Sequence, residues 1–169
     1  MNNAERFIEA YDKYADAIFR FAYFRVYNRE SAKELMQEAF CRAWQYVVDG
    51  KEIDNLRALL YQIARNLIID QARKKQAVSL DRMKENGFEP SNILDDIEKS
   101  LDQQTEWRAA MTGLDRLEPE YREAVELRYV AGFKPREIAQ IIGQNVNVVS
   151  VRINRGVQKI KHYLIGEKK

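Results

Sequence analysis

Apolar residues recur every three or four positions in three stretches of the first half of the chain. These stretches lie at residues 7–22, 35–47 and 56–67. Such spacing places the apolar side chains on one face of an α-helix and the intervening polar side chains on the opposite face. The pattern therefore predicts an N-terminal lobe of three long helices.

The expected start of the second helix has two candidates. Ser31 and Glu34 have the spacing of a capping box, and Asn28 is an alternative N-cap. The third helix also has two candidate caps, Asp54 and Asn55, because both side chains accept hydrogen bonds from backbone N–H groups of a first turn.

The second half of the chain predicts shorter helices. Their expected bounds are 106–117, 119–130 and 135–142, followed by a last helix that runs through Leu164. Gly143 is expected to end the third of these helices and Asn145 to cap the last. A helix of about eight residues, a short turn containing glycine and a longer helix form the pattern of a helix-turn-helix.

The two helical regions are separated by a stretch of different composition. Residues 77–105 show no sustained apolar stripe and carry three basic and seven acidic residues. Glycine, proline, serine and asparagine also interrupt this stretch, which favours irregular structure. We therefore expect an all-α protein with two small helical domains, residues 1–76 and 106–169, joined by an acidic linker over residues 77–105.

The last predicted helix has a basic stripe that is separate from its apolar stripe. At about 100° per residue, Arg152, Arg155 and Lys159 fall on one side of the helix. The neutral residues beside them are Asn147, Ser150, Val151 and Asn154. Such a face suits the major groove of DNA, where arginine and lysine contact phosphates or guanine and asparagine pairs with adenine. The alternative is a solvated basic helix with no binding role.

The third predicted helix carries a second basic patch. Its members are Arg65, Arg73, Lys74 and Lys75, and either phosphate contact or favourable interaction with the helix dipole explains them. Tyr61 and Arg57 lie on the same stretch. An exposed aromatic ring beside a cation is suited to stacking on an unpaired base, whereas a core position is the alternative for Tyr61.

Composition excludes several classes of site. The chain has 169 residues, a net charge of +2, one cysteine and one histidine. A disulfide within the chain and a zinc site built from several Cys or His ligands are thereby excluded. We expect no catalytic residues, cofactor, metal or small-molecule substrate, because no nucleophile constellation, glycine-rich phosphate loop or metal-ligand spacing appears. No apolar stretch is long enough for a membrane span and the N-terminus lacks a signal core, so we expect a cytoplasmic protein.

Four blocks, in this order, resemble conserved regions of the extracytoplasmic-function (ECF) sigma factors of the sigma-70 family. Residues 34–44, ELMQEAFCRAW, resemble region 2.2, and residues 59–70, LLYQIARNLIID, resemble the region 2.3–2.4 helix. Residues 117–124, LEPEYREA, resemble the start of region 4.1, and residues 133–161 resemble the region 4.2 helix-turn-helix. The recognition helix departs from the family pattern, because Val148 to Arg152 lack a usual hydroxyl and a usual lysine.

The resemblance implies a bacterial transcription initiation factor with several binding surfaces. The last helix would bind the promoter minus-35 element through Asn147, Ser150, Val151, Arg152, Asn154, Arg155 and Lys159. The first lobe would bind the minus-10 element and capture an expelled base through Asp49, Lys51, Asp54, Asn55, Arg57, Tyr61, Arg65, Asn66, Arg73 and Lys74. Core polymerase would be contacted through its β′ clamp and β flap, and the candidates for the clamp are Glu34, Gln37, Glu38 and Arg42.

Two further expectations follow from the resemblance. An anti-sigma factor is an expected partner, because free sigma factors of this type are commonly held inactive by one. The main alternative function is a stand-alone helix-turn-helix transcriptional regulator, which would bind DNA without polymerase.

Overall fold

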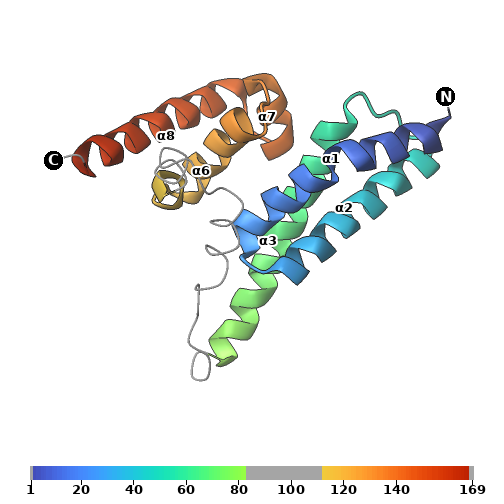
Figure 1. The fold of residues 1–169 in the computed structure, drawn as a ribbon, viewed down its shortest axis with the longest axis horizontal. Coiled ribbons are helices and arrows are strands. Elements are labelled where there is room, and N and C mark those ends of the chain that lie inside the picture. Colours follow the sequence, from blue (N-terminus) through green and yellow to red (C-terminus); the bar gives the residue numbers. More distant parts are fainter. Residues whose placement is uncertain (1, 83–111, 168–169) are drawn as a thin grey trace. The chain divides into compact units, whose positions relative to one another are not determined.

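The computed structural model describes residues 2–82 and 112–167, which belong to two compact units along the chain. All regular secondary structure in these residues is helical (Figure 1). The family resemblance and the two-lobed all-α prediction agree with this architecture. Most of the predicted linker, and the first part of the helix expected over 106–117, lie outside the described residues.

The N-terminal unit is a three-helix bundle. Its helices are α1 (Asn3–Val26), α2 (Arg29–Val48) and α3 (Leu56–Arg82), and each packs against the other two. Small side chains allow the helices to approach closely. The side chains with no exposed surface in this bundle are Ile18, Ala22, Ala32, Ala39, Ala43, Leu60 and Ala64.

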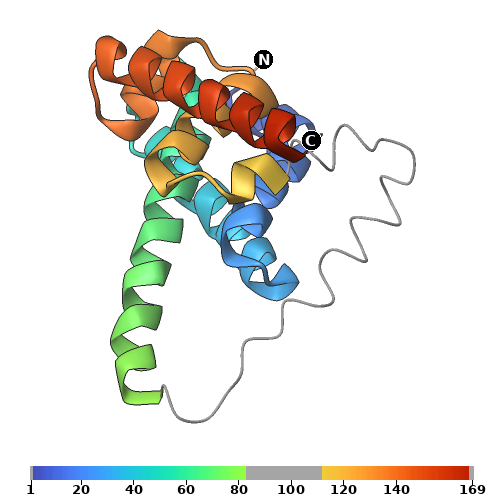
Figure 2. The same cartoon turned by 90° about the vertical axis from the view of Figure 1, so that its left-hand side faces the viewer.

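The structure decides between the alternative helix caps. The side chain of Asn28, not that of Ser31, caps α2, because its oxygen accepts a hydrogen bond from Ser31 N at 2.9 Å. Asn55 caps α3 and accepts from Ala58 N at 3.0 Å. The helix α3 continues to Arg82, past the domain boundary expected at residue 76, and its last turns project beyond α1 and α2 (Figure 2).

The C-terminal unit contains the expected helix-turn-helix. Its two helices are α7 (Pro135–Ile142) and α8 (Val146–Glu167). Gly143 ends α7 with a φ of 69°, in the left-handed region that glycine tolerates best, and Asn145 accepts a hydrogen bond from Val148 N at 2.9 Å. The predicted turn chemistry is thus confirmed at both positions.

The helix expected over residues 119–130 changes from α-helical to π-helical along its length. It consists of α6 (Pro119–Val125) and a π-helical turn, η1 (Glu126–Val130). Ala131 N donates to Glu126 O at 3.0 Å, which is the i to i−5 bond of a π-helix. The wider turn leads to Gly132 and Phe133, and Phe133 is fully buried.

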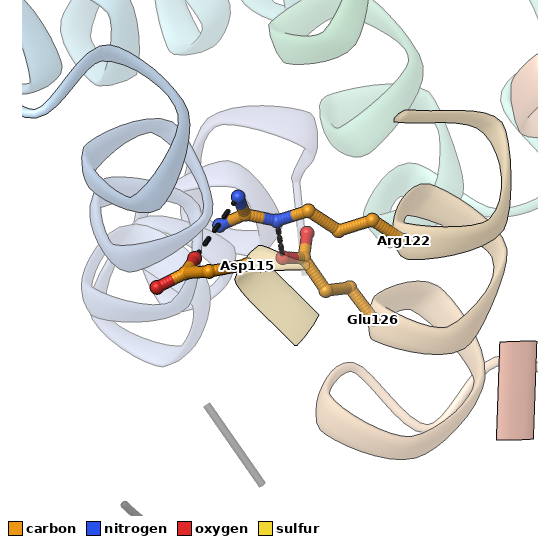
Figure 3. A network of polar contacts seen from close by, with 3 residues as sticks. All are labelled: Asp115, Arg122 and Glu126. Carbon is orange, nitrogen blue, oxygen red and sulfur yellow. Dashed lines mark hydrogen bonds and ion pairs between the residues drawn. The ribbon is translucent and has the colours of Figure 1, made fainter. Parts of the chain in front are cut away.

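Two features hold α6 in place. Gly156 of α8 lies against it so closely that an added Cβ would stand 2.6 Å from Val125 Cγ2. Arg122 joins two carboxylates: its Nη1 lies 3.1 Å from Asp115 Oδ1, and its Nε donates to Glu126 Oε1 at 2.7 Å (Figure 3). Arg122 and Glu126 have little exposed surface, so this is a largely desolvated ion pair.

Candidate nucleic-acid interface

The basic stripe of α8 exists in the structure, and its three cations differ in exposure. Arg155 is exposed, whereas the side chains of Arg152 and Lys159 keep 22% and 37% of their surface. The opposite side of α8 supplies the core, where Val149 is fully buried and Ile153 nearly so. The apolar contacts of α8 therefore fix which way the cations face.

Two acidic residues at the start of α6 approach the outer cations of this stripe. Lys159 Nζ lies 2.6 and 2.8 Å from the two carboxylate oxygens of Glu118, and 4.8 Å from the centre of the Tyr121 ring. Arg152 Nη2 lies 3.6 Å from Glu120 Oε2. No ion pair involves Arg155 in the described part of the chain.

The contact between Glu118 and Lys159 stabilises both charged forms. The hydrogen bond from Lys159 lowers the pKa of the Glu118 carboxyl, and the same hydrogen bond raises the pKa of the Lys159 ammonium. The carboxylate contributes stability above its unfolded pKa and loses that contribution as pH falls through the lowered value. Both groups are therefore charged throughout the neutral range.

Two shallow grooves follow this face of α8. The first has a volume of about 390 Å³ and is lined by Glu120, Tyr121, Asn145, Asn147, Val148, Val151, Arg152 and Arg155. The second, of about 370 Å³, is lined by Arg155, Gln158, Lys159, His162 and Tyr163. Arg155 belongs to both grooves. Of the other predicted residues, Asn154 is exposed and Ser150 half-buried, and neither lines a groove.

Glu118, Glu120 and Tyr121 also belong to this surface, which the sequence did not predict. They are distant from α8 in sequence: Glu118 and Lys159 are 41 residues apart. Acidic residues at a helix start are ordinarily explained by the helix dipole, so the sequence contains no signal for the pairing.

The N-terminal unit has a hollow beside the loop between α2 and α3. Its volume is about 440 Å³, and it is lined by Asn3, Arg6, Phe7, Val47, Gly50, Lys51, Glu52, Ile53, Asp54 and Leu56. Lys51 and Asp54 were predicted site residues. The α1 residues Asn3, Arg6 and Phe7 were missed, because helical periodicity does not reveal which loop the start of α1 approaches.

Four predicted minus-10 residues have structural contacts. The Asp49 carboxylate accepts from Gln45 Nε2 at 2.9 Å, and the Asn55 side chain caps α3. Tyr61 is 3% exposed, its ring centre lies 5.1 Å from that of Phe21, and burial raises its pKa. Of the two positions considered for Tyr61, the structure supports the core, so the ring is not an exposed stacking platform. Arg57 is half-buried beside that ring.

The remaining basic candidates lie along α3. Arg65 is half-buried, whereas Asn66, Arg73 and Lys74 are exposed. Asn66 and Arg73 are seven residues apart and therefore share one face of the helix. That face continues toward the projecting end of α3.

The four predicted clamp-binding residues form an exposed polar face of α2. They are Glu34, Gln37, Glu38 and Arg42. Arg42 Nε donates to Glu38 Oε1 at 2.8 Å, and both side chains keep about half of their surface. Cys41 is exposed on the same face, because it follows Gln37 by one helical turn, although a lone cysteine in an amphipathic helix is most simply interpreted as a small buried apolar residue.

The described residues contain neither a candidate membrane span nor a candidate metal site. No helix in residues 2–82 and 112–167 is both long and apolar enough to cross a bilayer. No group of three or more His, Cys, Asp or Glu side chains in the same ranges is arranged to hold a metal ion.

Comparisons with known proteins identify both units. Residues 10–78 match Sigma-70 region 2, and residues 107–160 match Sigma-70, region 4. The chain is 28% identical to the ECF RNA polymerase sigma factor BldN of Streptomyces coelicolor, over 95% of this chain and 61% of BldN. It is 30% identical to the ECF RNA polymerase sigma factor SigE of Mycolicibacterium smegmatis, over 90% of this chain and 59% of SigE. The chain thus spans about three-fifths of the length of these two relatives.

A solved structure has the same fold. The sigma factor RpoE of Bartonella quintana, crystallised with the anti-sigma factor NepR, superposes with a TM-score of 0.75 at 22% identity, over 95% of this chain and 97% of RpoE. The two family regions match in the expected order, and each falls on one of the helical units described above. The chain therefore belongs to the sigma-70 family, as a member of its ECF RNA polymerase sigma factors.

Proposed function

We propose that the protein is a promoter-recognition subunit of bacterial RNA polymerase. It binds the core enzyme through the β′ clamp and the β flap, recognises minus-35 and minus-10 elements, and assists opening of the DNA between them. The proposal is supported by the presence of both sigma-70 regions in one chain, together with an exposed Arg155 that lines both grooves of the recognition helix. No covalent chemistry is needed, because preferential binding to opened DNA shifts the equilibrium toward melting.

The helix α8 is the proposed minus-35 reader. Arg152, Arg155 and Lys159 lie on the same face as the two grooves, with Asn147 and Val151 beside them. These side chains offer the donors and the apolar contact that base edges and phosphates require in the major groove. Ser150 and Asn154 complete the predicted set at the margins of this face.

The hollow beside the α2–α3 loop is the proposed site for an expelled minus-10 base. Arg6 and Lys51 supply positive charge, Asp54 and Asn3 supply polar groups, and Phe7 supplies an apolar wall. Binding of a base there offsets the few kcal/mol needed to unstack it. Asn66, Arg73 and Lys74 on the exposed face of α3 then contact the phosphates, and Arg57 and Arg65 contribute positive charge along the same helix.

Other binding steps involve the rest of the chain. The exposed face of α2 with Glu34, Gln37, Glu38 and Arg42 binds the β′ clamp. The acidic stretch 77–105 passes through the basic nucleic-acid channel of the polymerase. An anti-sigma factor, as in the complex of RpoE with NepR, holds the protein inactive in the cytoplasm until it is released.

Replacement of Arg155 by alanine is expected to weaken binding of the holoenzyme to the upstream promoter element. Loss of one good base or phosphate contact costs about 1–3 kcal/mol, or roughly five- to 150-fold in affinity. The measurement is duplex binding by the holoenzyme, with core binding measured in parallel. Lys161→Ala is the matched control, because Lys161 is an exposed cation of the same helix that lines neither groove. Equal losses in both variants would contradict the assigned face.

Replacement of Gln37 and Glu38 together by alanine is expected to weaken binding to core polymerase and to leave DNA binding by α8 unchanged. Both side chains are exposed, so their loss leaves the bundle core intact but removes polar contacts with the clamp. We expect core binding to fall while the thermal unfolding temperature stays within a few degrees. Unchanged core binding would contradict the clamp assignment, and tight promoter binding by the isolated protein would favour a stand-alone regulator.

A further inference from the structure

The acidic start of α6 has an arrangement that helix capping does not explain. Glu118 is the N-cap residue of α6, yet its side chain makes no capping hydrogen bond. Both of its carboxylate oxygens instead lie within hydrogen-bond distance of Lys159 Nζ. Glu120, two residues later, makes a longer ion pair with Arg152, with 3.6 Å between Glu120 Oε2 and Arg152 Nη2. Two acidic residues at the start of α6, separated by Pro119, therefore pair with two cations of the recognition helix.

These pairings leave the basic stripe with an uneven charge. Lys159 and Arg152 each have a carboxylate partner, and Arg155 between them has none in the described residues. A DNA phosphate that approaches Lys159 competes with Glu118 for the ammonium donors and then lies close to that negative charge. The two carboxylates thus occupy the positions that phosphate oxygens would take.

We propose that Glu118 and Glu120 act as internal competitors of DNA phosphate, which limit the affinity of α8 for duplex DNA of any sequence. Contacts with phosphates supply essentially all of the sequence-independent affinity for DNA. Because two of the three cations are already paired with carboxylates, this sequence-independent affinity is reduced. Arg155 remains available for the specific contact. This inference rests on the proposed function, because it requires α8 to be the DNA-binding helix.

The test uses the full-length protein and a short duplex of mixed sequence, with affinity measured by fluorescence anisotropy between about 50 and 200 mM salt. Glu118→Gln keeps the size of the side chain and removes its charge. We expect the variant to bind about three- to tenfold more tightly at low salt, because one exposed pair no longer competes with phosphate. The slope of log affinity against log salt should also steepen by up to about one.

Two controls separate the proposed competition from a general effect of net charge. Glu9→Gln makes the same change in charge at an exposed position of α1, and it is expected to alter the affinity less than Glu118→Gln. When Lys159 is already replaced by glutamine, the further change Glu118→Gln should increase DNA affinity by no more than Glu9→Gln does. The reason is that the cation paired with Glu118 is then absent. Thermal unfolding should be almost unchanged in all variants, since exposed ion pairs contribute little to stability.

Unchanged or weaker binding by Glu118→Gln would overturn the inference, because it would mean that Glu118 is inert or positions Lys159 for DNA. Arg155→Ala, measured on the same duplex, distinguishes this failure from failure of the proposed function. If Arg155→Ala weakens binding and Glu118→Gln does not strengthen it, only the competition is wrong. If Arg155→Ala has no effect, α8 does not bind DNA, and both the inference and the DNA-binding assignment of α8 fail.

Discussion

Replacement of Arg122 by methionine is expected to destabilise the C-terminal unit by about 3–5 kcal/mol, the cost of breaking a buried ion pair by removal of one partner. The guanidinium of Arg122 lies between Asp115 and Glu126, and the Glu126 side chain is only 8% exposed (Figure 3). Without Arg122, the Glu126 carboxylate loses a charge-assisted hydrogen bond of 2.7 Å in a largely dry site. The measurement is the hydrogen-exchange protection of residues 112–167 in the full-length protein.

Two further variants test whether the loss of stability comes from the charge of Glu126. Arg122→Met combined with Glu126→Met removes both charges and should recover most of the lost stability, because apolar residues can replace a buried pair at little cost. Asp115→Asn should have a small effect, since the Asp115 side chain keeps 50% of its surface. A loss in the double variant as large as that in Arg122→Met would contradict an account based on the charge of Glu126 after its pair with Arg122 is broken.

Replacement of Gly156 by alanine is expected to destabilise the same unit by about 1–3 kcal/mol, the usual cost of overpacking a tight core. In an ordinary helix position this change would be stabilising, because alanine has the higher helix propensity. Here the new Cβ would meet Val125 Cγ2 at 2.6 Å and Tyr121 O at 3.4 Å. Valine is stiff at χ1, so its methyl group moves only if α6 and α8 separate.

Gly166→Ala is the matched control for Gly156→Ala. Gly166 lies on the same helix, and no atom lies within 4 Å of its added Cβ. We expect this variant to be neutral or slightly stabilised, because only the propensity contribution remains. If the two variants have equal unfolding midpoints by heat or urea, the close approach of α6 and α8 is not a constraint on position 156.

The arrangement of helices was predictable because it depends on short-range patterns. Amphipathic spacing is a property of a few turns, so α1, α2 and α3 were expected near their observed positions. The turn of the helix-turn-helix was predictable for the same reason, since Gly143 and Asn145 act on their own neighbours. The π-helical turn at Glu126–Val130 was not, because the spacing of apolar residues does not distinguish a single π-helical turn from an α-helical one.

The candidate site was less predictable because its contacts join distant parts of the chain. The basic stripe of α8 followed from helical geometry, but its pairing with Glu118 depends on tertiary packing that brings α6 beside α8. The hollow at the α2–α3 loop likewise includes Arg6, which belongs to the first turn of α1 and is far from this loop in sequence. For Tyr61, the apolar spacing allowed either a core or a surface position. In the structure its ring is buried and packs against the ring of Phe21.

Run-off transcription with purified bacterial core polymerase tests the central claim most directly. The template is a promoter library, and the reaction is performed with and without the protein. We predict transcripts that start at discrete sites only when the protein is present, and that are reduced by Arg155→Ala and by the double change at Gln37 and Glu38. Failure of the protein to recruit the core enzyme, together with tight binding of an operator by the protein alone, would contradict the account.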